Sequence, residues 1–305
     1  EIDIIPNKCG DNLSWSYDDN SQTLTISGSG NMYDYDLNNL PWNDYKEQIQ
    51  NINFPEGLTH IGTCAFVACT NITSITIPDS VTNIEGYTFQ NCSSLTSVDI
   101  PSSVTKINSN AFVGCSALKS FEIAENHPYY SFEEGVLFNK TKTKLVAYLM
   151  TNTQKEYSIP TTIKHIGEGA FYNNKSLTSV TIPNSVTSIG DSAFYYCDSL
   201  TSITIPDSVT SIGDSAFYWS TGLTSVTIGN SVTSIGEDAF RGCSSLEKGA
   251  VTRKACKIGC IGCKKCEKEC PAGAIQVVNN LAVIDYEKCT GCGTCKEKCP
   301  AKCIL

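Results

Sequence analysis

Residues 200–222 read LTSITIPDSVTSIGDSAFYWSTG, and units of this length recur along most of the chain. Phe217 of this unit has counterparts at a constant spacing, apart from one longer step between Phe112 and Phe171. The counterparts are Phe66, Phe89, Phe112, Phe171, Phe194 and Phe240. A fixed period of about 23 residues lies within the range that is typical of a leucine-rich-repeat solenoid.

The apolar positions of the unit predict how it folds. They are Leu200, Ile203, Ile205, Val209, Ile212, Ala216 and Phe217. The first three follow the register of a short parallel strand whose apolar side chains point inward, and the next two form a second buried pair. The last two would fill the interior from a short helical or 3₁₀ turn. The sequence therefore predicts stacked parallel strands joined by short helical or 3₁₀ turns.

Departures from the period divide the chain. Residues 1–50 break it and predict an N-terminal cap on a solenoid that spans 51–246. The long step between Phe112 and Phe171 exceeds two periods and contains two apolar runs around the polar stretch NKTKTK. We expect a hairpin insertion there, at about 126–160, that projects from the array.

The unit C/N-x-x-L-x-x-I-x-I-P-x-x-V-x-x-I-G-x-x-A-F resembles the BspA-like leucine-rich repeats of bacterial surface and secreted proteins. The stretches CGDNLSW (9–15), GSGNM (28–32) and GVLFNK (135–140) are similar to that family as well. The resemblance covers roughly residues 8–246. It implies a curved solenoid with a parallel sheet on its concave side, and a binding or adhesive role rather than catalysis.

Five cysteines of the repeats share the position three residues after the phenylalanine: Cys69, Cys92, Cys115, Cys197 and Cys243. Asn174 and Ser220 occupy the same position in the other units. We predict a buried ladder in which these small polar groups bond to the main chain of the turns. Disulfides or a metal are the alternatives, although Asn and Ser would interrupt either. Cys9 and Cys64 fall outside this position, and a bridge between them is conceivable in an exported protein.

Aromatic residues follow the phenylalanine in three successive units, as Tyr172, Tyr195 and Tyr218, with Tyr196 and Trp219 beside them. One interpretation is lateral packing between neighbouring turns. The other is an aromatic platform for a saccharide or a partner protein. We expect no catalytic site in the repeats, because His60, His127 and His165 lie in separate units without a nucleophile motif nearby.

The last part of the chain has a different cysteine chemistry. Residues 260–271 (CIGCKKCEKECP) and 289–300 (CTGCGTCKEKCP) each have the pattern C-x₂-C-x₂-C-x₃-C-P. Four soft thiolates satisfy one tetrahedral iron–sulfur cube, and the fourth cysteine of such a run ligates the other cluster. The pattern predicts two [4Fe–4S] clusters: one held by Cys260, Cys263, Cys266 and Cys299, the other by Cys289, Cys292, Cys295 and Cys270. Zinc is the alternative, but paired cysteines are its usual signature.

The internal duplication leaves Cys256 and Cys303 without ligand counterparts, so both are interpreted as bystanders. Between the motifs, apolar residues alternate around Asn279-Asn280 and predict a hairpin. Ile275, Val277, Leu281, Val283 and Tyr286 would form an apolar shell around the clusters. Residues 256–305 resemble bacterial two-cluster ferredoxins and are most similar to the ferredoxin-like region of the B subunit of Rnf-type electron-transfer complexes. Residues 247–255 would link this domain to the repeats.

Charge divides at the same place. Residues 1–246 contain 11 Lys and Arg against 25 Asp and Glu, whereas residues 247–305 contain 11 against 6, so the net charge of −9 separates into −14 and +5. The acidic body argues against nucleic acid as its partner, and the basic tail suggests a redox partner that is acidic where it docks. No stretch is apolar and long enough to span a membrane.

Two functions fit these features. In the first, the chain is not an enzyme but an electron-transfer protein whose repeats form an interaction scaffold. In the second, it is a surface adhesion or recognition protein, and the cluster segment is incidental or joined artificially. The repeats imply a secreted or cell-surface location, whereas the ferredoxin segment implies the cytoplasm or the cytoplasmic face of a membrane.

Overall fold

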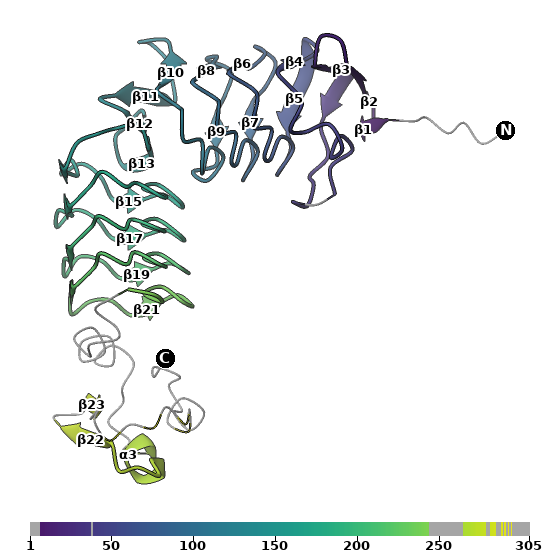
Figure 1. Ribbon diagram of the computed structural model, residues 1–305. Helices are drawn as coiled ribbons and strands as arrows, with labels where there is room; N and C mark the ends of the chain where they lie inside the picture. The colour runs from purple at the N-terminus through teal and green to yellow at the C-terminus, as the bar shows by residue number, and fades with distance from the viewer. Residues whose placement is uncertain are drawn as a thin grey trace. The chain divides into compact units, whose positions relative to one another are not determined.

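The computed structural model describes residues 7–37, 39–243, 265–278 and 281–284, together with residues 288, 290, 292 and 294 (Figure 1). The chain divides into two compact units. The first comprises Glu1–Thr153 and His165–Ser176, and the second comprises Gln154–Lys164 and Leu177–Leu305. Each unit is described by itself below.

The first unit begins with antiparallel strands and continues with parallel ones. Strands β1, β2 and β3 pair antiparallel, and β3 then pairs in parallel with β4 and with β5, which leads on to β7 and β9. A second parallel sheet has the order β10-β8-β6. These strands are β1 (Lys8–Gly10), β2 (Leu13–Asp18), β3 (Thr23–Asn31), β4 (Asn51–Asn53), β5 (Gly57–Ile61), β6 (Ser74–Thr76), β7 (Asn83–Ile84), β8 (Ser97–Ile100), β9 (Lys106–Ile107) and β10 (Ser120–Ile123).

The insertion in this unit forms three antiparallel strands, β11 (Tyr130–Glu133), β12 (Val136–Asn139) and β13 (Lys144–Tyr148). Strand β13 then pairs in parallel with β15 (His165–Ile166), in the register Lys144 to His165. Val136, Leu137 and Phe138 are buried. The insertion is therefore built into the array by its last strand instead of projecting from it.

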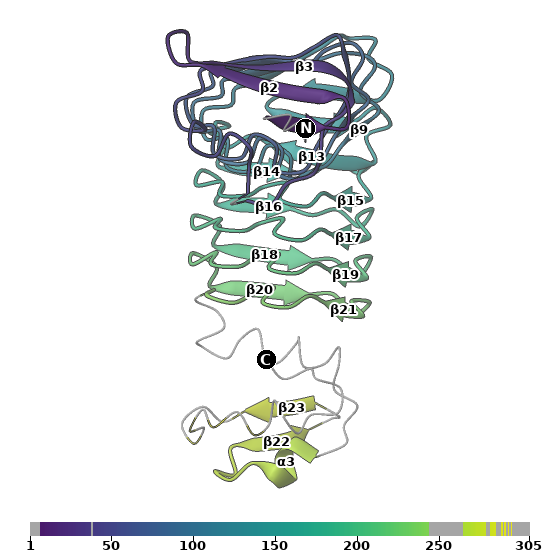
Figure 2. The same cartoon turned by 90° about the vertical axis from the view of Figure 1, so that its right-hand side faces the viewer.

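The second unit stacks two columns of parallel strands (Figure 2). One column has the order β14-β16-β18-β20, and in the other β19 pairs with β17 and with β21. Paired residues lie one repeat length apart in the chain, as Ile203 and Val226 do. The strands are β14 (Glu156–Ser158), β16 (Ser179–Thr181), β17 (Ser188–Ile189), β18 (Ser202–Ile205), β19 (Ser211–Ile212), β20 (Ser225–Ile228) and β21 (Ser234–Ile235).

The repeated apolar positions fill the interior, as the pattern predicted. Leu200, Ile203, Ile205, Val209, Ile212, Ala216 and Phe217 are all buried. The phenylalanines form face-to-face columns, with ring centroids 4.9 Å apart from Phe194 to Phe217 and again from Phe217 to Phe240. In the first unit Trp42 stacks on Phe66 at 5.5 Å and so extends that column into the cap. Each ring is held by rings of neighbouring turns, which explains why the array needs adjacent repeats.

The turns around the phenylalanine contain i→i+3 hydrogen bonds but no continuous helix in the described repeats. Tyr218 N–H donates to Ser215 O, and Ser220 N–H donates to Phe217 O. Ser215 and Trp219 have φ angles of 53° and 51°, in the left-handed region. These two residues interrupt the right-handed path on both sides of Phe217, so the i→i+3 bonds form the single short turns that the pattern predicted and do not extend into a longer helix.

In the described part of the cysteine-rich tail, α3 (Lys265–Glu269) is followed by β22 (Ile275–Val278) and β23 (Leu281–Ile284). The strands pair antiparallel with Val278 opposite Leu281, so the hairpin predicted at Asn279-Asn280 is confirmed. Among the described residues, no helix combines the length and the apolarity that crossing a membrane demands.

Candidate functional site

Cys92, Cys115 and Cys243 make the main-chain hydrogen bonds of the predicted ladder. The Cys92 thiol donates to Phe66 O at 3.2 Å, and the Cys115 thiol donates to Phe89 O at 3.0 Å. In the second unit the Cys243 thiol donates to Phe217 O at 2.9 Å. The Ser220 hydroxyl makes the same bond to Phe194 O at 2.6 Å and accepts from Cys197 N–H. One main-chain acceptor per turn thus explains why Cys and Ser share this position.

Burial makes these thiols poor nucleophiles and poor metal ligands. It raises the pKa of Cys243 to about 12 and holds the pKa values of Cys69 and Cys115 well above their usual range. Only a thiolate attacks an electrophile or binds a metal, and a buried site disfavours its charge. Within residues 7–37 and 39–243 all seven cysteines are free thiols, Cys9 and Cys64 included.

Two of the aromatic residues named from the sequence pack on each other. The rings of Tyr195 and Tyr218 lie face to face with centroids 4.9 Å apart and planes 15° apart. Arg241 occupies the same repeat position as these tyrosines, and its guanidinium lies 5.9 Å from the Tyr218 ring centroid. Sequence reasoning missed Arg241, although counting one repeat length onward from Tyr218 would have identified it.

Tyr196 and Trp219 form the outer row of this surface. The two residues are 36% and 45% exposed, and their ring centroids lie 6.5 Å apart with planes inclined by 40°. The ring centroids of Trp219 and Tyr218 lie 6.3 Å apart. Those of Tyr196 and Tyr195 lie 4.7 Å apart, with the rings edge-on. The stacked rings of Tyr195 and Tyr218 therefore support the rings of Tyr196 and Trp219, which are the exposed ones.

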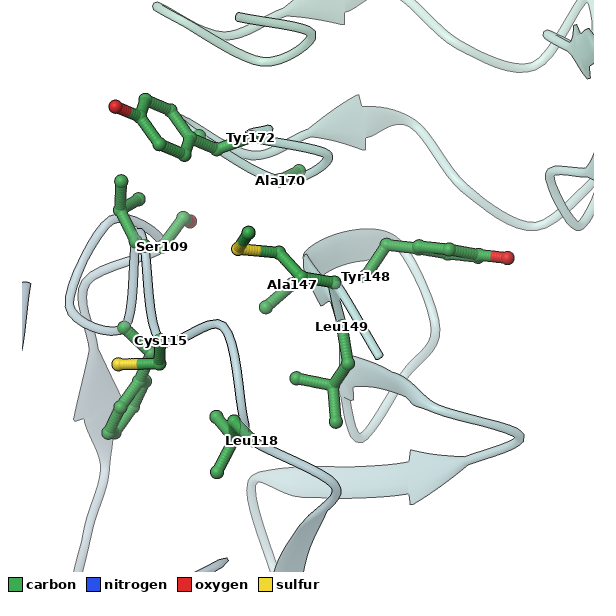
Figure 3. Close-up of a pocket in the computed structure, with 13 residues that line it drawn as sticks. Ser109, Cys115, Leu118, Ala147, Tyr148, Leu149, Ala170 and Tyr172 are labelled. Atoms are coloured by element: carbon green, nitrogen blue, oxygen red, sulfur yellow. The ribbon is translucent and has the colours of Figure 1, made fainter. Parts of the chain in front are cut away.

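Tyr172 has a different setting in the first unit. It is half-buried and lines a cavity of about 20 Å³ between the turn around Ser109 and Cys115 and the end of the insertion (Figure 3). The Ser109 hydroxyl, which also lines it, is buried without a hydrogen-bond partner among the described residues. A cavity of this size holds about one water molecule. The cavity reflects imperfect packing beside the insertion and is too small for a larger ligand.

The structure describes only some of the predicted cluster ligands. Cys266 lies in α3, Cys270 follows that helix, and Cys292 is exposed. The other predicted ligands lie outside the described residues: Cys260, Cys263, Cys289, Cys295 and Cys299. The same holds for Cys256, Cys303 and residues 247–255. The structure therefore shows the local geometry at the end of the first motif, around Cys270.

The surroundings of Cys270 suit a thiolate that binds a cluster. Ala274 N–H donates to Cys270 Sγ at 3.3 Å, across the turn Pro271–Gly273. Ala274 and Ile275 are buried beside it. A main-chain N–H directed at sulfur stabilises the charge of a cluster ligand, and apolar neighbours exclude water. A hydrogen bond between Cys292 and Thr294 lowers the pKa of the Cys292 thiol, which also favours the thiolate.

Two family models match the chain. Residues 44–153 and 141–268 match the BspA type leucine rich repeat region, in six copies. Residues 259–304 match the 4Fe-4S dicluster domain. The dicluster match covers both four-cysteine motifs, and four cysteines per motif provide ligands for two [4Fe–4S] clusters.

Several individual proteins are similar to parts of the chain. A leucine-rich repeat protein from Eubacterium ventriosum is similar over 78% of this chain and 75% of its own, with a TM-score of 0.61 and 29% identity. The pneumococcal vaccine antigen PcpA is similar over 62% of this chain and 61% of its own, with a TM-score of 0.47 and 23% identity. The B subunit of an ion-translocating oxidoreductase complex from Methanosarcina acetivorans is 63% identical over 46 residues, which are 15% of this chain and 17% of that protein.

Proposed function

Because the chain belongs to the BspA-type leucine-rich repeat family and carries a 4Fe–4S dicluster domain, we propose that it is an electron carrier whose repeats serve as an interaction scaffold. The observation that carries the proposal is the pair of C-x₂-C-x₂-C-x₃-C-P motifs within residues 259–304. Two bound [4Fe–4S] clusters would supply one-electron redox chemistry.

We assign the ligands by the crossover typical of such paired motifs. The first set is Cys260, Cys263, Cys266 and Cys299, and the second is Cys289, Cys292, Cys295 and Cys270. The bond from Ala274 N–H to Cys270 Sγ supports the placement of Cys270 among the ligands. In the turn after Cys270 the Gly273 amide donates to Cys270 O at 3.1 Å, and the Ala274 amide donates to the sulfur.

The residues around the cysteines would tune the carrier. Ala274 N–H partly compensates the negative charge on Cys270, which makes the reduced state easier to reach. The buried side chain of Ile275 keeps water from that sulfur. The net charge of +5 over residues 247–305 would guide this segment to an acidic surface on a redox partner.

A redox titration tests this function. The anaerobically reconstituted chain should show absorption near the visible–ultraviolet boundary that bleaches on reduction and returns on oxidation, with two one-electron steps. A matched control is Cys303→Ser, which alters a cysteine outside both motifs and should leave the titration unchanged. A preparation that takes up iron but shows no reversible one-electron step would refute the electron-carrier role.

The scaffold role rests on a different observation. Aromatic side chains of the repeats support this role, and the sequence pattern pointed to Tyr172, Tyr195, Tyr218 and Trp219. Of these, Trp219 is the exposed one. The candidate binding surface is therefore centred on Trp219.

A further inference from the structure

The turns of these repeats present a partly exposed aromatic surface, which we define as Tyr196, Tyr218, Trp219 and Arg241. Successive turns are joined directly, since Tyr196 N–H donates to Tyr218 O at 2.9 Å and Trp219 N–H donates to Arg241 O at 2.7 Å. These bonds join the main chains of the three neighbouring turns that carry the four residues. The aromatic surface is thus built on hydrogen-bonded turns of the array.

The backbone under the two outer rings is unfavourable for bulky residues. Tyr196 and Trp219 have φ angles of 56° and 51°, in the left-handed region that L-residues with large side chains avoid. The same position of the other turns holds Ala68, Asn91, Gly114, Asn173 and Gly242, and all have positive φ. Glycine and asparagine tolerate this conformation, so the turn folds without an aromatic residue there. Strained positions of this kind are enriched at binding sites.

Acidic residues predominate in the same repeats, and one of them contacts the aromatic surface. From Leu177 to Cys243 there are six carboxylates and one cation, Arg241. Asp191 and Asp214 are exposed, and each holds a carboxylate oxygen in place by accepting the main-chain N–H of the next turn, at 2.9 and 2.7 Å. Asp238 forms an ion pair of 3.1 Å with Arg241, which joins the acidic residues to the aromatic surface.

We propose that this surface docks a polypeptide segment rich in lysine or arginine. The faces of Tyr and Trp attract cations, and fixed carboxylates add a Coulomb attraction. Trp, Tyr and Arg are also the residues that dominate the binding energy of protein interfaces. The carboxylates would repel an acidic saccharide and would offer a neutral one hydrogen bonds but no Coulomb attraction, so the charge favours the basic polypeptide.

The proposal names the partner of the scaffold role and rests on that role, but it does not depend on the clusters. A chain whose clusters titrate normally and which binds no basic peptide would overturn this inference alone. Conversely, a chain that binds the peptide without reversible redox chemistry would overturn only the electron-carrier function.

Titration calorimetry on the full chain tests the proposal with three probes: a Lys- and Arg-rich peptide containing leucine, the same peptide with glutamate at every basic position, and chito-oligosaccharides. The first should bind, with an affinity that falls as salt rises, and the other two should not. The variant with Tyr196→Asn and Trp219→Asn uses a residue that other turns carry at this position. It should lower the affinity at least tenfold without lowering the melting temperature.

Tyr129→Ala is the matched control, because Tyr129 is 45% exposed but lies in the first unit. It should leave the affinity unchanged. The proposal is wrong if the basic peptide does not bind, if the Asn variant binds it as tightly as the unaltered chain, or if the saccharide binds instead. Concentration-dependent self-association that the peptide does not reverse would mean that the chain's own basic tail occupies the surface, and would also contradict it.

Discussion

The thiol of Cys115 lies 3.0 Å from the main-chain oxygen of Phe89, a residue of the preceding turn of the solenoid. The same bond between successive turns recurs between Cys243 and Phe217. Serine makes it at position 220. The cysteines of the repeats are therefore hydrogen-bond donors inside the fold, in contrast to those of the tail, whose spacing suits metal ligands.

Replacing Cys115 should separate the hydrogen bond from the thiol chemistry. Cys115→Ser retains a donor to Phe89 O, so we expect a change in the free energy of unfolding below about 1 kcal/mol. Cys115→Val leaves that oxygen without its thiol donor and adds bulk, and should destabilise by about 1–3 kcal/mol. Urea unfolding followed by circular dichroism measures both. Equal losses for Ser and Val would show that packing, not the donor, determines this position.

Labelling should distinguish the two groups of cysteines by residue. In the folded chain at pH 8, iodoacetamide should leave Cys69, Cys115 and Cys243 unmodified, because burial raises their pKa values and blocks access. In urea the same three residues should react, as peptide mass mapping would record. Rapid labelling of Cys243 in the folded chain would contradict its place in the ladder.

Stability should decrease in alkali. Burial raises the pKa of Cys9 to about 11 and that of Cys243 to about 12, both from 9.0. Above pH 9 the unfolded chain releases protons that the folded chain retains, so the free energy of unfolding falls as pH rises from 9 towards 12. Urea titrations at several pH values measure the slope. The variant with Cys9→Ser and Cys243→Ser should show a shallower fall, and an identical slope would assign the effect to other groups.

The phenylalanine column should carry much of the stability of the repeats. The Phe217 ring stacks on those of Phe194 and Phe240, with ring centroids 4.9 Å apart in both cases. Phe217→Ala should lower the free energy of unfolding by about 3–5 kcal/mol, because it removes a buried ring and leaves a cavity. Phe217→Leu, which refills part of the volume, should cost clearly less. A loss below about 1 kcal/mol for alanine would mean that the turns hold their geometry without the column.

His127 has a structural role that can be tested. It is fully buried; Nε2 donates to Pro101 O at 2.9 Å, and Nδ1 accepts from Tyr129 and Tyr130 N–H at 3.1 Å. His127→Leu leaves three main-chain groups without these bonds and should destabilise by about 2–4 kcal/mol in urea unfolding. His165→Ser, at an exposed position where other turns carry serine, should cost less than about 1 kcal/mol. Equal effects would remove the special role of His127.

The local sequence patterns predicted the structural features that recur with the repeat or arise from adjacent residues. The buried strand positions such as Ile203 and Ile205 follow from spacing alone, because every turn repeats the same environment. The cysteine ladder was predictable for the same reason, since Ser220 in the place of Cys indicated a shared small donor. The hairpin at Asn279-Asn280 followed from two apolar runs around a turn dipeptide.

The insertion was less predictable because its outcome depends on long-range pairing. Strand β13 joins β15 with Lys144 opposite His165, an offset shorter than the repeat length that separates paired residues of the regular strands. Tyr148 stacks on Phe171 at 5.0 Å and its N–H donates to Ala170 O, so a tyrosine takes the place of the missing phenylalanine. A search for phenylalanine at a fixed period does not find it. The left-handed φ of Tyr196 and Trp219 was equally hidden, since aromatic residues rarely adopt it.

The central claim is that the chain contains two cysteine chemistries, protonated hydrogen-bond donors in the repeats and cluster ligands in the tail. Metal and acid-labile sulfide analysis of the anaerobically purified full chain tests it most directly. We predict about eight irons and eight sulfides per chain, as two [4Fe–4S] clusters require, and the same values for the Cys115→Ser variant. About two zinc ions per chain without sulfide, or iron that is lost with Cys115, would contradict the account.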